Sequence, residues 1–236
     1  MSGHEGQDAA DLGVRLRRTH SDVVADGHVT PAFAALVAAA RAGAAEIKER
    51  PADRSFLEST LEDALVRHLP GTTSTGQSRT RFALEGFEPH PYGVDIDWTH
   101  AGMHAGVETK VSDTLDSLFD VVKLTTAIAR GHFEEGYCAV AATASQWARG
   151  VAFSAMTEAS PGAWREAAVQ ELLAHPAARK AVLVATGPRP HTVPAQIETM
   201  TVEPIAMPGA PTHTLRLLAV RPAARSTWLD LPRRDD

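Results

Sequence analysis

The sequence predicts a mixed α/β domain in which helices flank a central β-sheet. Strand-like patterns, in which apolar and polar residues alternate, occur at 93–98 and 105–111, and a continuous apolar run fills 137–144. Helical patterns precede and follow the first two strands, at 53–69 and 112–130. Strands interspersed with amphipathic helices are typical of layered α/β folds.

The N-terminal part of the chain predicts a helical extension of this domain. Residues 1–30 are polar and weakly patterned, which predicts a flexible tail. Residues 31–50 are rich in alanine and begin with a proline, a residue that is tolerated in the first turn of a helix. Pro51 would end this helix, so we expect a tail and an alanine-rich helix over 1–50 and the main domain over 51–236.

The helix expected at 53–69 has one apolar face, formed by residues spaced three or four apart. That face consists of Leu57, Leu61, Ala64, Leu65 and His68. Pro70 and Gly71 follow and are expected to stop the helix.

The middle of the chain predicts a three-stranded meander. A loop is expected at 71–78, followed by strands at 79–87, 93–98 and 105–111, with residues 99–104 connecting the last two. The next helix, 112–130, has a repeating apolar face and ends before Gly131. The remaining elements are expected to be a buried strand at 137–144, a helix near 163–174, a strand at 180–186, and an edge hairpin formed by 198–206 and 213–221.

Composition and charge limit the functions that the chain can have. The formal net charge of −6 does not suit a protein that coats nucleic acid through bulk electrostatics, although it leaves room for a local basic surface. No apolar run is long enough to span a bilayer, and the N-terminus lacks the apolar core of a signal peptide. The single cysteine, Cys138, has no partner for a disulfide within the chain. These observations indicate a cytoplasmic protein without a membrane partner.

Four charged residues are expected to meet on the meander. Alternate residues of a strand share a face, so Asp95 and Asp97 would point one way, and so would Glu108 and Lys110. Two carboxylates can hold Mg²⁺ while the ion keeps several waters, and a neighbouring lysine can stabilise charge that develops on a phosphate. The alternative is a solvated polar strand face that carries a cross-strand ion pair.

This pattern resembles the PD-(D/E)XK, or restriction-endonuclease-like, nuclease superfamily. Its members share a helix, a three-stranded meander, a helix and a strand, with Asp on the second strand and Glu-x-Lys on the third. The match covers roughly residues 53–145, with Asp95, Glu108 and Lys110 at the motif positions; Val94 stands where the family usually has proline. The resemblance implies a restriction-endonuclease-like sheet and a metal-dependent nuclease. Asp95 and Glu108 would bind Mg²⁺ or Mn²⁺, and Lys110 would stabilise the transition state.

The resemblance also implies auxiliary residues and partners. A glutamate on the first helix often assists metal binding, and both Glu58 and Glu62 are candidates. The helix after the third strand offers Lys123, with Asp120 one turn before it, and Asp97 is a further auxiliary candidate. DNA is the implied substrate, in foreign-DNA defence or DNA processing, with a homodimer or larger complex completing the contact.

Two other interpretations stay open. The chain could be a catalytically inactive member of the same fold that serves as a binding or regulatory subunit. It could also be a small-molecule hydrolase with a histidine-rich metal site, because His90, His100 and His104 lie near the acidic strands.

Overall fold

The structure is a computed structural model that describes residues 29–47, 54–76, 81–82, 92–111, 114, 116–158, 162–174, 179 and 192–231. The helices are α2 (Pro31–Glu46), α3 (Arg54–His68), α4 (Asp116–Ala129), α5 (Ala144–Arg149), α6 (Val151–Thr157) and α7 (Val169–Leu173). The first strands are β1 (Thr72–Thr75), β2 (Arg81–Phe82), β3 (Tyr92–Gly93), β4 (Ile96–His100), β5 (Met103–Val111) and β6 (Glu135–Thr143). The later strands are β7 (Trp164–Ala168), β8 (Thr192–Pro194), β9 (Gln196–Thr201), β10 (Ile205–Ala206), β11 (His213–Pro222) and β12 (Trp228–Asp230).

One mixed, eight-stranded sheet organises the described chain. Its strand order is β1-β4-β5-β6-β11-β9-β7, and β10 pairs with β11. The β4–β5 pair is antiparallel, whereas β5 and β6 are parallel and are connected through α4. The other neighbours in the sheet are antiparallel. Two further two-stranded sheets are formed by β2 with β3 and by β8 with β12.

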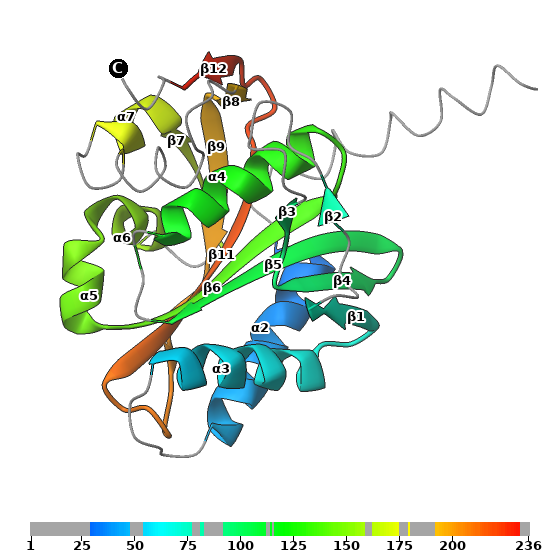
Figure 1. Cartoon of the computed structure of the whole chain (residues 1–236), viewed down its shortest axis with the longest axis vertical. Coiled ribbons are helices and arrows are strands. Elements are labelled where there is room, and N and C mark those ends of the chain that lie inside the picture. The colour runs from blue at the N-terminus through cyan, green and yellow to red at the C-terminus, as the bar shows by residue number, and fades with distance from the viewer. Residues whose placement is uncertain are drawn as a thin grey trace, which may run out of the picture.

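Helices cover both faces of the sheet (Figure 1). α2 and α3 lie on one face, and α4 lies on the other face with α5, α6 and α7. Each face has its own buried apolar cluster, because alternate residues of the central strands point to opposite sides. The fold is therefore a mixed α/β arrangement with a multi-strand sheet between helices, as the sequence predicts.

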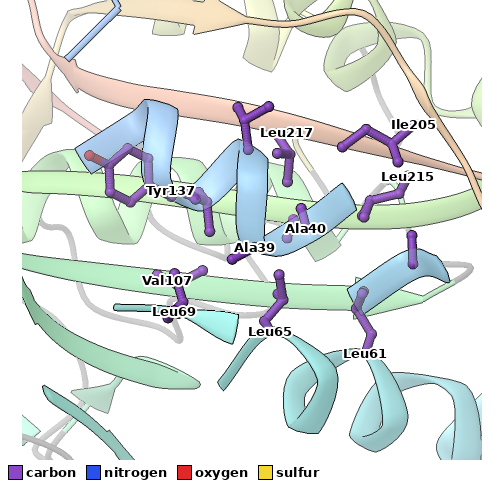
Figure 2. Close-up of a cluster of buried hydrophobic side chains, with 14 of the residues drawn as sticks. Ala39, Ala40, Leu61, Leu65, Leu69, Val107, Tyr137, Ile205, Leu215 and Leu217 are labelled. Atoms are coloured by element: carbon purple, nitrogen blue, oxygen red, sulfur yellow. The ribbon is translucent and has the colours of Figure 1, made fainter. Parts of the chain in front are cut away.

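The alanine-rich helix α2 packs directly against the sheet. Its side chains Ala39 and Ala40 lie close to Leu65 of α3 and to Leu215 and Leu217 of β11 in one buried cluster (Figure 2). Small side chains let the helix approach the strands closely. The helix starts at an N-cap, where the Thr30 hydroxyl accepts a hydrogen bond from the Phe33 amide at 3.1 Å.

Helix α4 has the sequence features of a well-defined buried helix. Leu118 and Val122 are buried, as the apolar periodicity predicts, and Val121 is buried as well. The helix ends in a Schellman motif in which Gly131, at φ +79°, adopts a left-handed conformation. The His132 amide donates to the Ala127 carbonyl, and the Gly131 amide donates to the Ile128 carbonyl.

Three expectations about the elements were wrong. Residues 71–78 were expected to be a loop, but they contain β1. The four consecutive hydroxyl residues of this segment form a strand because their backbone pairs with β4. The helix expected near 163–174 is β7 followed by the short α7, because the Trp164–Ala168 backbone pairs with β9. The segments 198–206 and 213–221 were expected to form a hairpin at the edge of the sheet. The second segment forms β11, which lies inside the sheet between β6 and β9.

Other expectations fall partly outside the described residues. Only 81–82 of the strand expected at 79–87 is described, and the strand expected at 180–186 and the tail at 1–28 are not. The alanine-rich helix ends at Glu46 and not at residue 50. Among the described helices, none has the length and apolar character that a bilayer crossing requires.

Candidate active site

The candidate site is built on the β4–β5 hairpin. A two-residue turn joins the strands, with Ala101 at φ 52° and Gly102 at φ 82°, which is the pattern of a type I′ turn. The turn fixes the register, so that His100 pairs with Met103 and Ile96 pairs with Val107. β5 continues beyond this last pair, and the segment past Val107 carries the acid and the lysine of the motif.

Asp95 lies at the bend immediately before β4 and is held by the neighbouring strand. Its Oδ2 accepts hydrogen bonds from the Thr109 amide at 2.8 Å and from the Thr109 hydroxyl at 3.1 Å. The carboxylate thus accepts a hydrogen bond from a β5 amide that lies beyond the last residue pair between β4 and β5. This contact places Asp95 beside Glu108 and Lys110, which flank Thr109 in the chain.

The expected simple alternation of side chains stops at this bend. Ile96 and Trp98 belong to the apolar cluster under α2 and α3, whereas Val94 belongs to the cluster under α4. Asp95 and Asp97 consequently have different surroundings. Asp97 lies opposite Gly106, and its Oδ1 is 2.7 Å from the Nε2 of His104.

Lys110 is surrounded by carboxylates from two helices and from the bend before β4. Its Nζ is 3.6 Å from the Glu58 Oε1 of α3, 3.9 Å from the Asp95 Oδ2 and 3.7 Å from the Asp120 Oδ2 of α4. Burial lowers the pKa of Lys110, but these carboxylates and Glu108 outweigh burial and raise the pKa overall. Lys110 therefore remains a cation at neutral pH.

Glu108 forms a buried ion pair with α4. Its Oε1 is 2.6 Å from the Nζ of Lys123, which also lies 3.2 Å from the Asp120 Oδ1. Glu108, Asp120 and Lys123 are all nearly inaccessible to solvent. A deeply buried charge is stable only when other charges or hydrogen bonds compensate it, so these three side chains depend on one another.

The site as a whole contains more acids than bases. Four carboxylates, from Glu58, Asp95, Glu108 and Asp120, surround the two lysines. Burial raises the pKa of Glu108, and the nearby carboxylates of Asp120 and Asp95 raise it further. Lys123 lowers this pKa only in part, so it stays well above the usual range. Burial also lowers the pKa of Lys123, which Glu108 and Asp120 reverse. An acidic excess of this kind favours uptake of a proton or of a cation.

The structure selects among the residues expected from sequence. It brings together Asp95, Glu108, Lys110, Lys123 and, of the two candidate glutamates, Glu58. Glu62 is one helical turn further along α3, and Asp97 contacts His104. Asp120, expected only as a neighbour of Lys123, contacts both lysines; the signal for it was a charged pair three residues apart inside an otherwise apolar helix.

The histidines of the acidic strands have other partners. His104 contacts Asp97, and its ring lies against Phe133, while His100 stacks on Trp98 with ring centroids 5.7 Å apart. His90 lies outside the described residues. Within the described ranges, no group of three or more His, Cys, Asp or Glu side chains is arranged to hold a metal ion.

The carboxylates of the site are oxygen donors, the type of ligand that a hard divalent cation requires. Mg²⁺ is usually held through one or two carboxylates and keeps several waters, and Mn²⁺ accepts the same donors. Asp95 and Glu108 supply two carboxylates on adjacent chain segments. In the part of the chain that is described, buried oxygens of Glu108 and Asp120 have a lysine nearby but no aligned hydrogen bond. Carboxylate oxygens such as those of Asp95 and Glu108 are the type of donor that Mg²⁺ and Mn²⁺ accept.

Comparisons of the chain with protein-family models, with curated proteins and with solved structures found no match.

Proposed function

We propose that this protein is a metal-dependent nuclease of the PD-(D/E)XK type that hydrolyses phosphodiester bonds of DNA. One observation carries the proposal: Asp95, Glu108 and Lys110 gather where β4 begins and β5 continues past it. Glu58 reaches the same place from the preceding helix. Carboxylates that hold a metal ion and an amine that stabilises charge on the phosphate can together support phosphodiester hydrolysis.

The order of elements around the site supports the same proposal. α3 is followed by β1, β4 and β5 as an antiparallel meander, then by α4 and by β6, which runs parallel to β5. The superfamily that the motif resembles has this succession. In this proposal β1 corresponds to the first strand of the meander, which the sequence predicted at 79–87.

Each side chain has a defined part in the proposed reaction. Asp95 and Glu108 would hold Mg²⁺ or Mn²⁺, which supplies Lewis acidity and a lowered pKa for a bound water. Lys110 would place its ammonium group beside the phosphate and stabilise the charge that develops on the phosphate oxygens. Glu58 and Asp120 would keep Lys110 charged and oriented.

Plasmid cleavage tests the proposal. Supercoiled DNA would be incubated with Mg²⁺ or Mn²⁺ and with wild type, Asp95→Asn or Lys110→Met. We expect each substitution to reduce the cleavage rate by at least about 10²-fold, the usual cost of removing a group that stabilises transition-state charge. Asp63→Asn is the matched control, because Asp63 is an exposed acid of α3. Cleavage by Asp95→Asn and Lys110→Met at the wild-type rate would refute the assignment.

A second candidate function is a catalytically inactive binding or regulatory subunit of the same fold. The Lys123 ammonium lies 2.6 Å from Glu108, so that a protein cation already neutralises one proposed metal ligand. Calorimetry with Mg²⁺ and Mn²⁺ separates the two functions. Metal binding by wild type that Asp95→Asn abolishes supports the nuclease, whereas DNA binding without metal binding or cleavage supports the subunit.

A further inference from the structure

Three arginines in the described residues stack on tryptophans, and their surroundings differ. Arg221 lies over Trp164 at 4.2 Å, and its Nη2 is 2.5 Å from the Glu198 Oε2. Arg216, on the same strand β11, lies over Trp147 of α5 at 4.3 Å. The third pair is Arg130 with Trp228.

Arg216 differs from Arg221 in having no carboxylate at ion-pair distance among the described residues. Its Nη1 donates to the Thr157 hydroxyl at 2.9 Å, and that hydroxyl donates in turn to the Ser154 carbonyl. Burial lowers the pKa of Arg216, and the more distant Glu158 opposes this only in part. The guanidinium is thus fixed on an indole ring and partly desolvated without a counter-ion.

Two buried donors at this stack lack an acceptor. Within the described ranges, neither the Nε of Arg216 nor the Nε1 of Trp147 has a hydrogen-bond partner, and both atoms are inaccessible to solvent. Trp147 itself is only 5% exposed. An unsatisfied buried donor is costly, and most such donors in native proteins have a partner. A neutral water could accept one hydrogen bond, but an anion would also balance the charge of Arg216.

The stack lies on the same face of the sheet as the candidate active site. Val140 of β6 pairs in register with Lys110 on one side and with Arg216 on the other. Residues in register on neighbouring strands point to the same face, here the face that α4 and α6 cover. With strands about 4.8 Å apart, the Cα atoms of Lys110 and Arg216 are roughly 10 Å apart.

We propose that Arg216 and Trp147 form an anion site that binds a phosphate of the nucleic-acid backbone next to the reacting one. Because Arg216 as a whole is only half-buried, a phosphate would approach its guanidinium from the surface. Binding would open the packing around the buried Arg216 Nε and Trp147 Nε1, which then donate to the phosphate oxygens, while Thr157 and the indole ring orient the guanidinium. A planar guanidinium suits phosphate better than an ammonium group does. The identity of the ligand rests on the proposed nuclease function, whereas the existence of an anion site does not.

Inorganic phosphate tests the site separately from catalysis. Thermal unfolding would be followed with phosphate and with KCl at matched ionic strength, because phosphate also stabilises proteins nonspecifically. We expect phosphate to raise the Tm of wild type and of Arg221→Gln by several degrees more than it raises the Tm of Arg216→Gln. Trp147→Phe keeps an aromatic ring but removes the donor, and it should show the same reduced shift. Equal shifts in all four proteins would overturn the site.

DNA binding identifies the source of the phosphate. A fluorescein-labelled duplex would be titrated in Ca²⁺ at several salt concentrations. We expect Arg216→Gln to bind about tenfold to a hundredfold more weakly and to reduce the salt slope by about one, with Arg221→Gln close to wild type. If Arg216→Gln lost the phosphate-dependent rise in Tm but bound the duplex as tightly as wild type, the assignment to a backbone phosphate would be overturned and a site for free phosphate would remain. Failure of wild type to cleave DNA, with the phosphate result intact, would overturn the nuclease alone.

Discussion

Each charged side chain of the candidate site is stabilised by a neighbour of opposite charge. Contacts run from Glu58 to Lys110, from Lys110 to Asp120, and from Asp120 through Lys123 to Glu108. Coulomb attraction is strong at this depth because little water screens it, but removing the charges from water is costly. The chain of contacts therefore stabilises the site only while all members are present.

Replacing Lys123 by methionine tests this dependence. The change keeps the length of the side chain but leaves Glu108 and Asp120 buried without their nearest cation, so we expect a loss of about 3–5 kcal/mol in the free energy of unfolding. Urea denaturation measures this loss. Added Mg²⁺ should restore more stability in Lys123→Met than in wild type, because the ion would take over the role of the ammonium group.

Two further variants make the result specific to the ion pair. Lys123→Arg keeps the charge and should cost less, and adding Glu108→Gln to Lys123→Met should recover part of the loss because no uncompensated charge remains. A loss below about 1 kcal/mol for Lys123→Met would place its pair with Glu108 in the range of exposed salt bridges and contradict the buried network.

Among the elements, the β4–β5 hairpin controls the geometry of the site. Its turn residue Ala101 has a left-handed backbone, which costs an L-residue about 1–2 kcal/mol, while asparagine followed by glycine is preferred in a type I′ turn. We expect Ala101→Asn to raise the free energy of unfolding by about 1 kcal/mol in urea denaturation and to leave cleavage unchanged.

Glycine at the next position provides the matching control for the hairpin. Gly102 also has a positive φ, so Gly102→Ala should lower stability by a similar amount. If Ala101→Asn were no more stable than wild type, the turn would not be type I′ in solution. If it were more stable but cleaved more slowly, the strain at Ala101 would contribute to the positions of Asp95 and Glu108.

Elements with strong local patterns could be predicted from the sequence, and elements defined by pairing could not. The segments that became α3, β5, α4 and β6 have clear periodicity or continuous apolar character, and the structure confirms them. The Trp164–Ala168 segment has helix-favouring residues but forms β7, because pairing with β9 outweighs propensity. β1 was missed because its threonines also suit a loop.

The candidate site shows the same division. The spacing of Glu108 and Lys110 followed from strand alternation, which the structure retains on β5. The contact of Glu58 with Lys110 depends on how α3 packs against β5, and a helical pattern alone does not give that rotation. The bend at Asp95 could not be predicted for a related reason. The sequence pattern of Gly93–Trp98 is that of one continuous strand, whereas in the structure the Thr109 amide donates to the Asp95 carboxylate and not to a further residue of the strand.

At the scale of the whole molecule, the central position of β11 links the two halves of the sheet. It pairs with β6 on one side and with β9 on the other, so the later strands extend the sheet that carries the candidate site. An apolar strand pattern indicates burial but not which strands are its neighbours. For that reason the sequence predicted an edge hairpin where the structure has a core strand, and the surroundings of Arg216 could not be anticipated.

The molecule as a whole should lose stability in alkali, because several buried groups bind protons more tightly in the folded state. Burial, reinforced by Glu135, raises the pKa of Tyr137; burial and Asp120 raise that of Cys138; and the surrounding carboxylates raise those of Lys110 and Lys123. Above the unfolded-state values of 9.0 for cysteine, 10.0 for tyrosine and 10.5 for lysine, the unfolded chain releases these protons while the folded chain keeps them.

The free energy of unfolding should therefore fall as pH rises above about 9, by about 1.4 kcal/mol per pH unit for each proton that only the folded state retains. Urea unfolding at a series of alkaline pH values measures the slope. Tyr137→Phe removes one such proton, so above pH 10.0 its slope should be shallower than that of wild type by about one proton. Parallel curves for the two proteins would mean that Tyr137 ionises as readily in the folded chain as in the unfolded one, and that its hydroxyl is not held against Glu135 in solution.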